Sequence, residues 1–291
     1  MSSRSSGGSS GLSAYLQVAP LALFTIAFVG VPIGTLVLLS FWQTDGIFIY
    51  REFTLDNYRQ MLSSPLTYAL FFTTIKFAAI TLIVTTIIGF ICSYFLVFHV
   101  RNLKWQIGLL LLCTIPFWTS NVIRMISWIP FLGREGIFNQ TIIAMGLTNQ
   151  PLDFLLYSEF AVILTYIHLY TLFMIVPIFN SMAKINPNLI EAARDAGASG
   201  WQILYTVIIP LSKTGIALGS IFVVTLVMAD FFVVRVMSGG QSASVVSAMK
   251  NQIDNLFYPQ AAAMAIMLIA VVALLVSGIL RVVDIRAELA R

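Results

Sequence analysis

Residues 185–215 read INPNLIEAARDAGASGWQILYTVIIPLSKTG, and they separate two long apolar stretches of the chain. Asn186 followed by Pro187 predicts the start of a helix, because Asn caps free backbone N–H groups and Pro suits the first helical position. Gly197 predicts the end of that helix, since glycine readily adopts the left-handed conformation that closes a helix C-terminus. We therefore expect a short helix between Pro187 and Gly197.

A second helix is expected after the turn at Gly197. Ser199 can cap its first turn, and Pro210 is expected to interrupt it before the next apolar stretch, because proline lacks a backbone N–H. In the first helix, Ala192 and Ala193 leave a shallow surface into which another protein can pack closely. The segment is too polar to cross a membrane and too apolar to be a simple linker, which indicates an exposed interaction element.

Six stretches, including the two that flank this segment, are long and apolar enough to cross a lipid bilayer. A membrane helix needs about 20 mostly apolar residues to cover the hydrocarbon layer. We therefore predict an all-α membrane protein with six transmembrane helices. The stretches are roughly residues 15–42, 69–98, 106–132, 160–182, 215–236 and 261–283.

The composition agrees with a lipid environment. Hydrophobic residues make up 59% of the 291 positions and charged residues only 10%, and the mean hydropathy is +0.92. A water-soluble domain of this size could not bury that much apolar surface. We expect one membrane domain over residues 15–283, in which residues 183–214 form the exposed segment. A flexible Ser/Gly-rich tail at 1–14 and a short tail at 284–291 should flank this domain.

The basic residues predict the orientation of the chain in the membrane. If both termini lie in the cytoplasm, the cytoplasmic segments carry nine Lys and Arg residues and the outer loops carry four. This asymmetry is the one that the positive-inside rule predicts. The net charge of +4 then reflects topology and needs no nucleic-acid partner. The cytoplasmic residues are Arg4, Arg101, Lys104, Lys184, Arg194, Lys213, Arg281, Arg286 and Arg291, and the outer ones are Arg51, Arg59, Arg134 and Lys250.

Four ionisable residues lie within or at the rim of the predicted spans, in the outer half of the membrane. Charged side chains are costly in lipid and should face protein or water, so we expect a polar cavity that opens outward. Two interpretations stay open for Arg124 and Asp230: a structural ion pair, or direct contact with a solute. The ionisable residues are Lys76, Arg124, Asp230 and Arg235, and the other candidate walls are Trp118, Asn121, Phe231 and Phe232.

The remaining reactive side chains predict no catalytic residue and no metal site. Cys92 and Cys113 fall within predicted helices and are expected to pack as small apolar residues. His168, alone in the fourth span, is expected to be a hydrogen-bonded packing residue. Neither an HExxH motif nor a Ser/His/Asp set is visible, and a single membrane acid, Asp230, argues against a proton-coupled secondary transporter. We expect a transport subunit rather than an enzyme.

The spacing within the central segment is specific. Glu191-Ala192-Ala193, three residues, Gly197, nine residues and then Val207-Ile208-Ile209-Pro210 resembles the coupling loop of permeases in binding-protein-dependent ABC importers. The usual ending is Ile-x-Leu-Pro, so Val207 and Ile209 are mild departures. The resemblance implies the type I ABC importer permease fold with a cytoplasmic coupling helix seated on an ATPase. It assigns docking and force transmission to Glu191, Ala192, Ala193, Asp195, Gly197 and Pro210.

The same resemblance implies the partners and the location. The chain contains no phosphate loop of the form GxxxxGKS or GxxxxGKT, so ATP and Mg²⁺ should bind to a separate ATPase dimer and this chain should need no cofactor. The family also implies a second permease subunit, forming a heterodimer, and a periplasmic solute-binding protein that docks on the outer loops. We expect a bacterial inner-membrane protein with both termini in the cytoplasm.

Three further stretches resemble the spermidine/putrescine branch of this family, and in particular its B-type subunit. They are residues 53–62 (FTLDNYRQML), 116–139 (PFWTSNVIRMISWIPFLGREGIFN) and 229–240 (ADFFVVRVMSGG). The last stretch departs from the branch, because Arg235 stands where an acidic residue is usual and Val234 replaces a proline. A polycation favours carboxylates and aromatic faces. Polyamine-like amines are therefore the first expectation, and a zwitterionic, amino-acid-like or anionic solute is the alternative.

Overall fold

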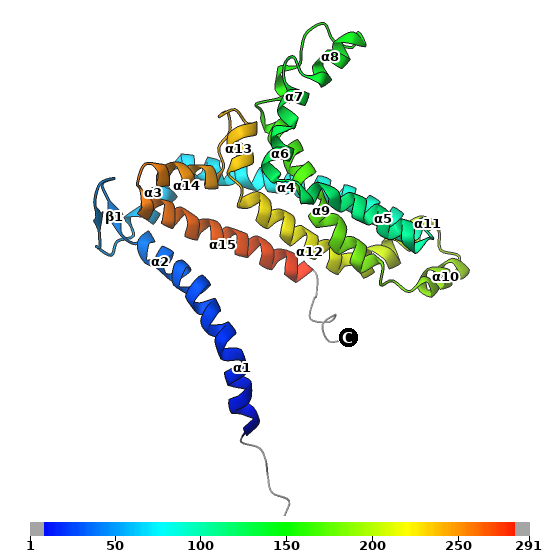
Figure 1. Ribbon diagram of the computed structural model, residues 1–291, viewed down its shortest axis with the longest axis horizontal. Coiled ribbons are helices and arrows are strands. Elements are labelled where there is room, and N and C mark those ends of the chain that lie inside the picture. The colour runs from blue at the N-terminus through cyan, green and yellow to red at the C-terminus, as the bar shows by residue number, and fades with distance from the viewer. Residues whose placement is uncertain (1–8, 283–291) are drawn as a thin grey trace, which may run out of the picture. The chain divides into compact units, whose positions relative to one another are not determined.

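The computed structural model describes residues 9–282, and these residues are mostly helical (Figure 1). Contacts divide the chain into two compact units: residues 1–63 with 251–267, and residues 64–250 with 268–291. The predictions made for residues 1–8 and 283–291, at the two ends of the chain, lie outside the described residues.

The first unit contains the first apolar helix. This helix runs through α1 (Ser9–Thr25), the π-helical turn η1 (Ile26–Gly30) and α2 (Val31–Ser40). Residues 9–14, which were expected to belong to the tail, are already helical. Once a helix has formed in the apolar stretch, each further residue adds a hydrogen bond at little cost, so it extends into the serines and glycine before that stretch.

A short hairpin and a helix follow the first span. Strand β1 (Gln43–Thr44) pairs antiparallel with β2 (Ile49–Tyr50), and α3 (Asp56–Ser63) comes next. Asn57 in α3 donates from Nδ2 to the carbonyl oxygens of Ser40 and Trp42, at 2.9 and 2.8 Å. These bonds satisfy carbonyls at the end of α2, which have no partner within the helix itself.

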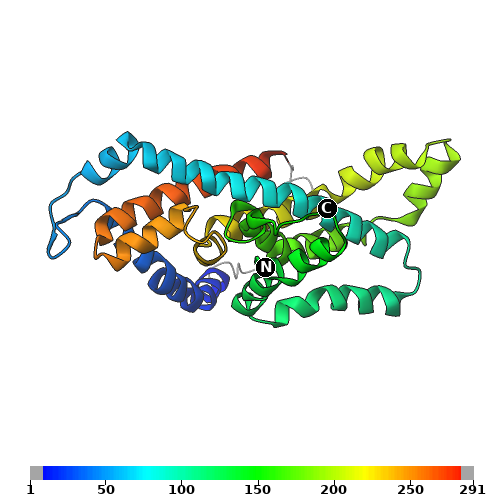
Figure 2. The same ribbon diagram turned by 90° about the horizontal axis from the view of Figure 1, so that it is seen from above.

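Three long helices form the core of the second unit. Helices α4 (Pro65–Phe98), α9 (Glu159–Met182) and α12 (Ile209–Met228) pack against one another (Figures 1 and 2). Met174 of α9 fills the space beside two glycines: a Cβ on Gly89 would lie 2.7 Å from its Cγ, and one on Gly219 would lie 2.5 Å from its Sδ. Small residues at helix contacts allow the close backbone approach that is typical of helices in lipid.

The third predicted span is broken rather than continuous. Within residues 9–282, five helices are long and apolar enough to cross a membrane, or six if the bent pair Leu103–Trp118 and Asn121–Ala144 counts as one span. The pair bends by 90°, so the prediction of one straight helix over 106–132 is wrong. Two local features explain the break. Pro116 lies in a 3₁₀ turn, η2 (Ile115–Trp118), and Ser120 accepts a hydrogen bond from the Val122 N–H and so begins a new helix.

The second half of the broken pair consists of short helices. They belong to the second unit and precede α9. Asn139 is buried there, and its side chain connects two loops: Nδ2 donates to Gly133 O at 3.0 Å, and Oδ1 accepts from the Leu152 N–H at 2.8 Å. The first half contains α5 (Leu103–Thr114), and the second half contains α6 (Asn121–Ile126), α7 (Trp128–Leu132) and α8 (Ile137–Ala144), with the 3₁₀ turn η3 (Asp153–Leu155) after them.

The fifth span differs from its prediction at both ends. It was expected over 215–236, but the helix runs from Gly200 to Met228. A separate helix, α13 (Phe232–Met237), follows. The break arises because Asp230 Oδ1 accepts a hydrogen bond from the Val233 N–H at 2.8 Å, which makes Asp230 a cap rather than an interior helical residue. Helices α14 (Val245–Asp254) and α15 (Tyr258–Val282) complete the described chain.

Candidate functional site

The exposed segment begins with a short capped helix, as predicted. Helix α10 spans Pro187–Asp195, with Pro187 in its first turn. Asn186 Oδ1 accepts a hydrogen bond from the Asn188 N–H at 3.0 Å, so the asparagine side chain satisfies a backbone donor that has no partner in the helix. The prediction of a helix start at Asn186 and Pro187 is therefore confirmed.

The same helix ends in a glycine-dependent motif. Gly197 has φ +84°, a conformation that other L residues adopt only with strain. Its N–H donates to Arg194 O at 2.8 Å, and the Ala198 N–H donates to Ala193 O at 3.0 Å. These two bonds are those of the Schellman motif, which closes the last turn of a helix. The predicted stop at Gly197 is confirmed.

Helix α10 offers a surface to a partner. It projects beyond the ends of α9 and α12 (Figure 1), and Figure 2 shows the same projection from above. None of its residues is buried. Ala193 is half-buried, and the exposed residues among those assigned to docking are Glu191, Ala192, Asp195 and Gly197.

The second helix of the segment begins at its predicted cap. Ser199 Oγ accepts from the Gln202 N–H at 3.4 Å, and Gln202 Oε1 accepts from the Ser199 N–H at 2.7 Å. This reciprocal pair is a capping box, which satisfies two backbone donors at once. It fixes the direction in which the chain leaves the turn after α10.

Pro210 does not interrupt the helix, so that prediction is wrong. Helix α11 (Gly200–Ile203), the π-helical turn η4 (Leu204–Ile208) and α12 form one continuous run to Met228. The Ile209 N–H bonds to Leu204 O across five residues. Because the wider turn shifts the hydrogen-bond register just before Pro210, the ring and the missing N–H fit without ending the helix. The exposed segment is thereby joined to a membrane helix without a break.

The residues predicted to line an outer cavity include a hydrogen-bonded carboxylate. Asp230 lies between α12 and α13, and its Oδ2 accepts from the Tyr170 hydroxyl at 3.0 Å. With the Val233 N–H on Oδ1, both carboxylate oxygens have a donor. Asp230, Phe231 and Phe232 are each half-buried, and the two phenylalanine rings meet edge to face with centroids 6.1 Å apart.

Arg124 and Asp230 do not form the ion pair considered from the sequence. Within the described residues, Arg124 Nη2 donates to Asn121 Oδ1, while Asp230 is held by Tyr170 and a backbone N–H. Arg124 is only 7% exposed, and its Nε has no hydrogen-bond partner among residues 9–282. Tyr170 lies within electrostatic reach of both charges. The interpretation of Arg124 and Asp230 as a direct structural ion pair is therefore wrong.

The other predicted wall residues lie further out. Trp118 is 77% exposed at the end of the 3₁₀ turn η2, and Asn121 and Arg235 are also exposed. Arg235 occupies the last turn of α13, five residues beyond Asp230. The structure thus gives Asp230 a half-buried carboxylate and Arg124 a largely buried side chain, while Trp118 and Arg235 lie at the surface of the chain.

Three functional contacts were not predicted from the sequence. Tyr170 was not singled out, although a tyrosine in an apolar helix needs a hydrogen-bond partner. Lys76 Nζ pairs with both carboxylate oxygens of Glu159, at 2.6 and 2.7 Å, across α4 and α9. His168 Nδ1 accepts from Trp128 Nε1 at 3.0 Å, which confirms that His168 is hydrogen-bonded, although its side chain is exposed rather than packed in the core.

Outside the membrane, the hairpin after α2 holds a perturbed carboxylate. Asp45 accepts from the backbone N–H groups of Phe48 and Ile47, at 2.7 and 2.9 Å, and from the Tyr50 hydroxyl at 2.9 Å. These donors stabilise the charged form and hold the pKa of Asp45 below its ordinary value. The hydrogen bond between the Tyr50 hydroxyl and Asp45 also raises the pKa of Tyr50.

The described residues thus contain several helices long and apolar enough to cross a membrane, and a capped, exposed helix lies between two of them, as in a multi-pass membrane protein. The family model described as "Binding-protein-dependent transport system inner membrane component" matches residues 108–288. The chain belongs to that family. It is a permease subunit of a binding-protein-dependent importer and a multi-pass protein of the inner membrane.

Named relatives cover nearly the whole chain. The spermidine/putrescine transport system permease protein PotB of Haemophilus influenzae is 31% identical over 90% of this chain and 91% of its own length. PotB of Escherichia coli K12 is 31% identical over 89% of this chain and 94% of its own. The inner membrane ABC transporter permease protein YdcU of the same strain is 26% identical, over 91% and 88%.

A solved structure supports the fold. A bacterial alginate ABC transporter, crystallised with an alginate pentasaccharide-bound periplasmic protein, has a chain that superposes with a TM-score of 0.72. The match covers 92% of each chain at 16% identity, a level that supports the fold and not the solute. The predicted all-α permease fold is confirmed.

Proposed function

We propose that this permease subunit transports polyamine-like amines. The observation that carries the proposal is the Asp230 carboxylate, which lies half-buried beside Phe231 and Phe232 with its orientation fixed by Tyr170. A carboxylate beside aromatic faces suits an ammonium group. The 31% identity to PotB proteins over about nine-tenths of the chain supports the same solute class.

Uptake by the complete importer tests the solute. The four kinds of subunit are expressed in cells that lack their own polyamine importers, and uptake of labelled spermidine and putrescine is measured. Both should be taken up, and Asp230→Asn should raise the KM for uptake strongly while leaving the amount of the complex unchanged. Uptake that is unaffected by Asp230→Asn would show that this carboxylate does not recognise the solute.

A second candidate solute is an anion or a zwitterion with a carboxylate. Arg124 favours it, because this residue is 7% exposed and its Nε has no hydrogen-bond partner in the described part of the chain. Buried donors of this kind usually have a hydrogen-bond acceptor. Competition separates the candidates: excess glutamate or another amino acid should not reduce amine uptake if amines are the solute.

Helix α10 is the docking element for a partner ATPase. Its exposed residues and the left-handed turn at Gly197 support this role, and so does the continuous helix from Gly200 to Met228, because a load on α10 passes through one short turn into a membrane helix. ATP and Mg²⁺ bind to an ATPase dimer, and this chain catalyses no reaction itself. Cysteine cross-linking from Ala192→Cys to the ATPase tests the contact, and Ala196→Cys, at the exposed C-cap of the same helix, is the comparison.

The complete importer contains further partners. A second, non-identical permease subunit completes the pathway, and a periplasmic solute-binding protein delivers the solute from outside. Both termini lie in the cytoplasm, which the basic residues support. Accessibility of single cysteines at positions 48 and 194 to a membrane-impermeant thiol reagent in intact cells tests this orientation. Position 48 should react and position 194 should not.

A further inference from the structure

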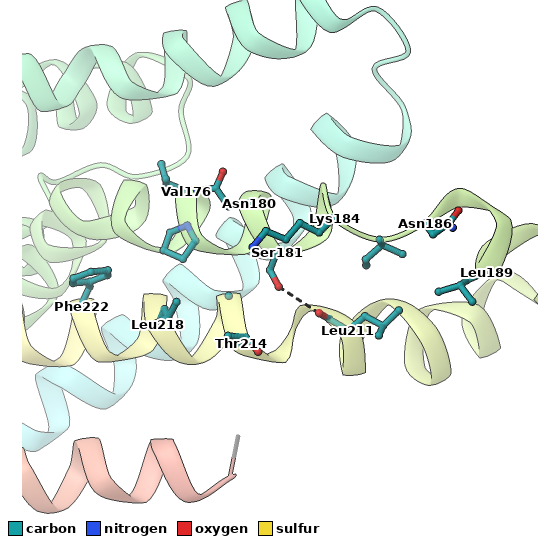
Figure 3. A pocket seen from close by; sticks show the side chains of 13 residues that line it. Val176, Asn180, Ser181, Lys184, Asn186, Leu189, Leu211, Thr214, Leu218 and Phe222 are labelled. Carbon is teal, nitrogen blue, oxygen red and sulfur yellow. Dashed lines mark hydrogen bonds between the residues drawn. The ribbon is translucent and has the colours of Figure 1, made fainter. Parts of the chain in front are cut away.

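A groove between α9 and α12 lies at the end of the second unit that carries α10. Its volume is about 650 Å³, and both helices line it (Figure 3). It continues past the end of α9 to Ile185 and Asn186, which lead into α10, and to Leu189 within α10. The solute site proposed above involves none of its residues, because Asp230 lies beyond the other end of α12.

One end of the groove is polar and carries a positive charge. Lys184 follows the last residue of α9 by two positions, and its side chain runs alongside Ser181 (Figure 3). Within residues 9–282 its ammonium group makes no side-chain hydrogen bond or ion pair. Asn180 adds an exposed amide beside it. This end therefore offers a cation and an amide that can donate to an anion.

The other part of the groove is apolar. Leu218 and Phe222 of α12 line it together with Val176 and Pro177 of α9 (Figure 3). Leu211 lies at the polar end, where Ser181 Oγ donates to its carbonyl oxygen at 3.3 Å, and Phe222 lies eleven residues further along α12, which corresponds to roughly 16 Å along a helix. An occupant that fits this groove has a compact anionic group at one end and a hydrocarbon chain at the other.

We propose that the groove binds one anionic phospholipid of the cytoplasmic leaflet. The phosphate lies at Lys184 and an acyl chain follows Leu218 and Phe222. Basic pockets between membrane helices on the cytoplasmic side suit anionic headgroups. The same charge disfavours an amine, which separates this groove from the amine pathway. The inference rests on the cytoplasmic placement proposed above and is independent of the transported solute.

The position of the groove gives the lipid a consequence for coupling. Leu189 lines the groove and belongs to α10, and Leu211 lies next to Pro210 at the start of α12. A bound lipid thus contacts both the docking helix and the membrane helix to which it connects. Occupancy should stabilise the arrangement of these two helices.

The test measures lipid binding to the purified, complete importer. The complex is freed of lipid in detergent and titrated with phosphatidylglycerol or with phosphatidylcholine that has the same acyl chains, and bound lipid is counted by native mass spectrometry. Tight binding of phosphatidylglycerol alone is expected. Lys184→Gln should weaken it by about fivefold, the factor expected for one cation at an anionic headgroup.

A matched variant separates the groove from general surface attraction. Lys213→Gln removes the same charge two residues from Leu211, but Lys213 does not line the groove. Lys213→Gln should leave the affinity for phosphatidylglycerol nearly unchanged. Lys184→Arg keeps the charge and should also bind phosphatidylglycerol with nearly unchanged affinity. Equal losses in Lys184→Gln and Lys213→Gln, or equal binding of phosphatidylcholine, would overturn the proposal.

A photo-cross-linking residue at position 218 identifies the occupant directly. Capture of phospholipid in membranes supports the proposal, since Leu218 lines the apolar part of the groove. Capture of the second permease subunit instead would show that the groove is a subunit interface, and the lipid site would be excluded.

Discussion

The Tyr170 hydroxyl donates a hydrogen bond to Asp230 Oδ2 at 3.0 Å, and this bond joins α9 to the break between α12 and α13. Asp230 thus has two structural functions: it caps α13 through Val233 and it connects two helices through Tyr170. A carboxylate with both oxygens held in this way keeps one orientation. Such an orientation suits a group that must meet a charged solute repeatedly in the same geometry.

Tyr170→Phe should weaken solute recognition more than folding. The change removes one hydrogen bond to a charged group, which contributes about 1.5–3 kcal/mol. We expect the KM for amine uptake to rise by about tenfold or more, with an unchanged amount of assembled complex. Initial uptake rates over a range of amine concentrations check this.

Tyr166→Phe is the matched control for this change. Tyr166 lies one turn earlier on α9 and its ring stacks on that of Tyr170, with centroids 5.7 Å apart, but no hydrogen bond joins it to Asp230. If Tyr166→Phe raised the KM as much as Tyr170→Phe, the hydroxyl of Tyr170 would have no specific role in recognition.

Asp45 gives a prediction about acid. The pKa of its carboxyl is lowered from 3.8 by the Phe48 and Ile47 N–H groups and by Tyr50. A lowered pKa in the folded state means that the ionised carboxylate stabilises the hairpin fully above 3.8, and that this contribution disappears as the pH falls below that value. The hairpin should therefore be equally protected at pH 7 and pH 5.

Hydrogen exchange of residues 43–50, corrected for the intrinsic effect of pH, measures this protection. Asp45→Ala should increase exchange at both pH values, because it removes the acceptor for all three donors. Asp45→Asn keeps one acceptor oxygen and should give an intermediate result with no dependence on pH in this range. A loss of protection between pH 7 and 5 in the unmodified protein would contradict the lowered pKa.

The long helices were predictable because lipid leaves the backbone few alternatives. A spanning segment must satisfy its own N–H and C=O groups, so apolar length nearly determines a helix. The predicted stretches 69–98, 160–182 and 261–283 correspond to α4, α9 and α15, with ends that differ by four residues or fewer. The caps at Asn186, Gly197 and Ser199 were also predictable, because each depends on one side chain and its near neighbours.

The breaks within spans were not predictable from hydropathy. Pro210 fits within a continuous helix because a π-helical turn precedes it, whereas Pro116 lies in a 3₁₀ turn at a 90° bend. The two prolines look alike in sequence, and only the local hydrogen-bond register distinguishes them. The partners of Asp230 and Lys76 are similar cases, because Tyr170 and Glu159 lie 60 and 83 residues away in the chain.

Gly215→Ala should destabilise the contact between α9 and α12. A Cβ at this position would meet Pro177 O, and it would lie 2.6 Å from Ser181 Cβ and 2.9 Å from Ile178 Cα. These atoms belong to the backbone or lie next to it, so the helices must move apart. Overpacking of this kind costs about 1–3 kcal/mol. The midpoint of thermal unfolding of the purified complex should fall.

Gly108→Ala provides the comparison for Gly215→Ala. Gly108 lies within α5, and a Cβ there would have no neighbour within 4 Å. The midpoint of thermal unfolding of the Gly108→Ala complex should match that of the unmodified complex or lie above it, because alanine is a better helix former than glycine. An unchanged midpoint in Gly215→Ala would mean that α9 and α12 are less closely packed than the structure shows.

Gly197→Ala tests whether the left-handed turn after α10 is needed for coupling. An L residue at φ +84° is strained by about 1–2 kcal/mol, and that strain acts on the two hydrogen bonds that close α10. We expect weaker association with the ATPase and a loss of solute-stimulated ATP hydrolysis, while the membrane helices stay folded. Gly197→Asp should have the same effect more strongly, because it adds a charge at the docking surface.

Gly200→Ala is the control, since Gly200 lies three residues away, has no positive φ, and would carry a Cβ with no neighbour within 4 Å. It should assemble and hydrolyse ATP normally. Co-purification of the ATPase and hydrolysis with and without the loaded binding protein measure the two properties separately. If Gly197→Ala retained both ATPase binding and solute-stimulated hydrolysis, the left-handed turn would be needed only for the local shape of the chain. Coupling from α10 through Ser199 and the π-helical turn to α12 would then not depend on this turn.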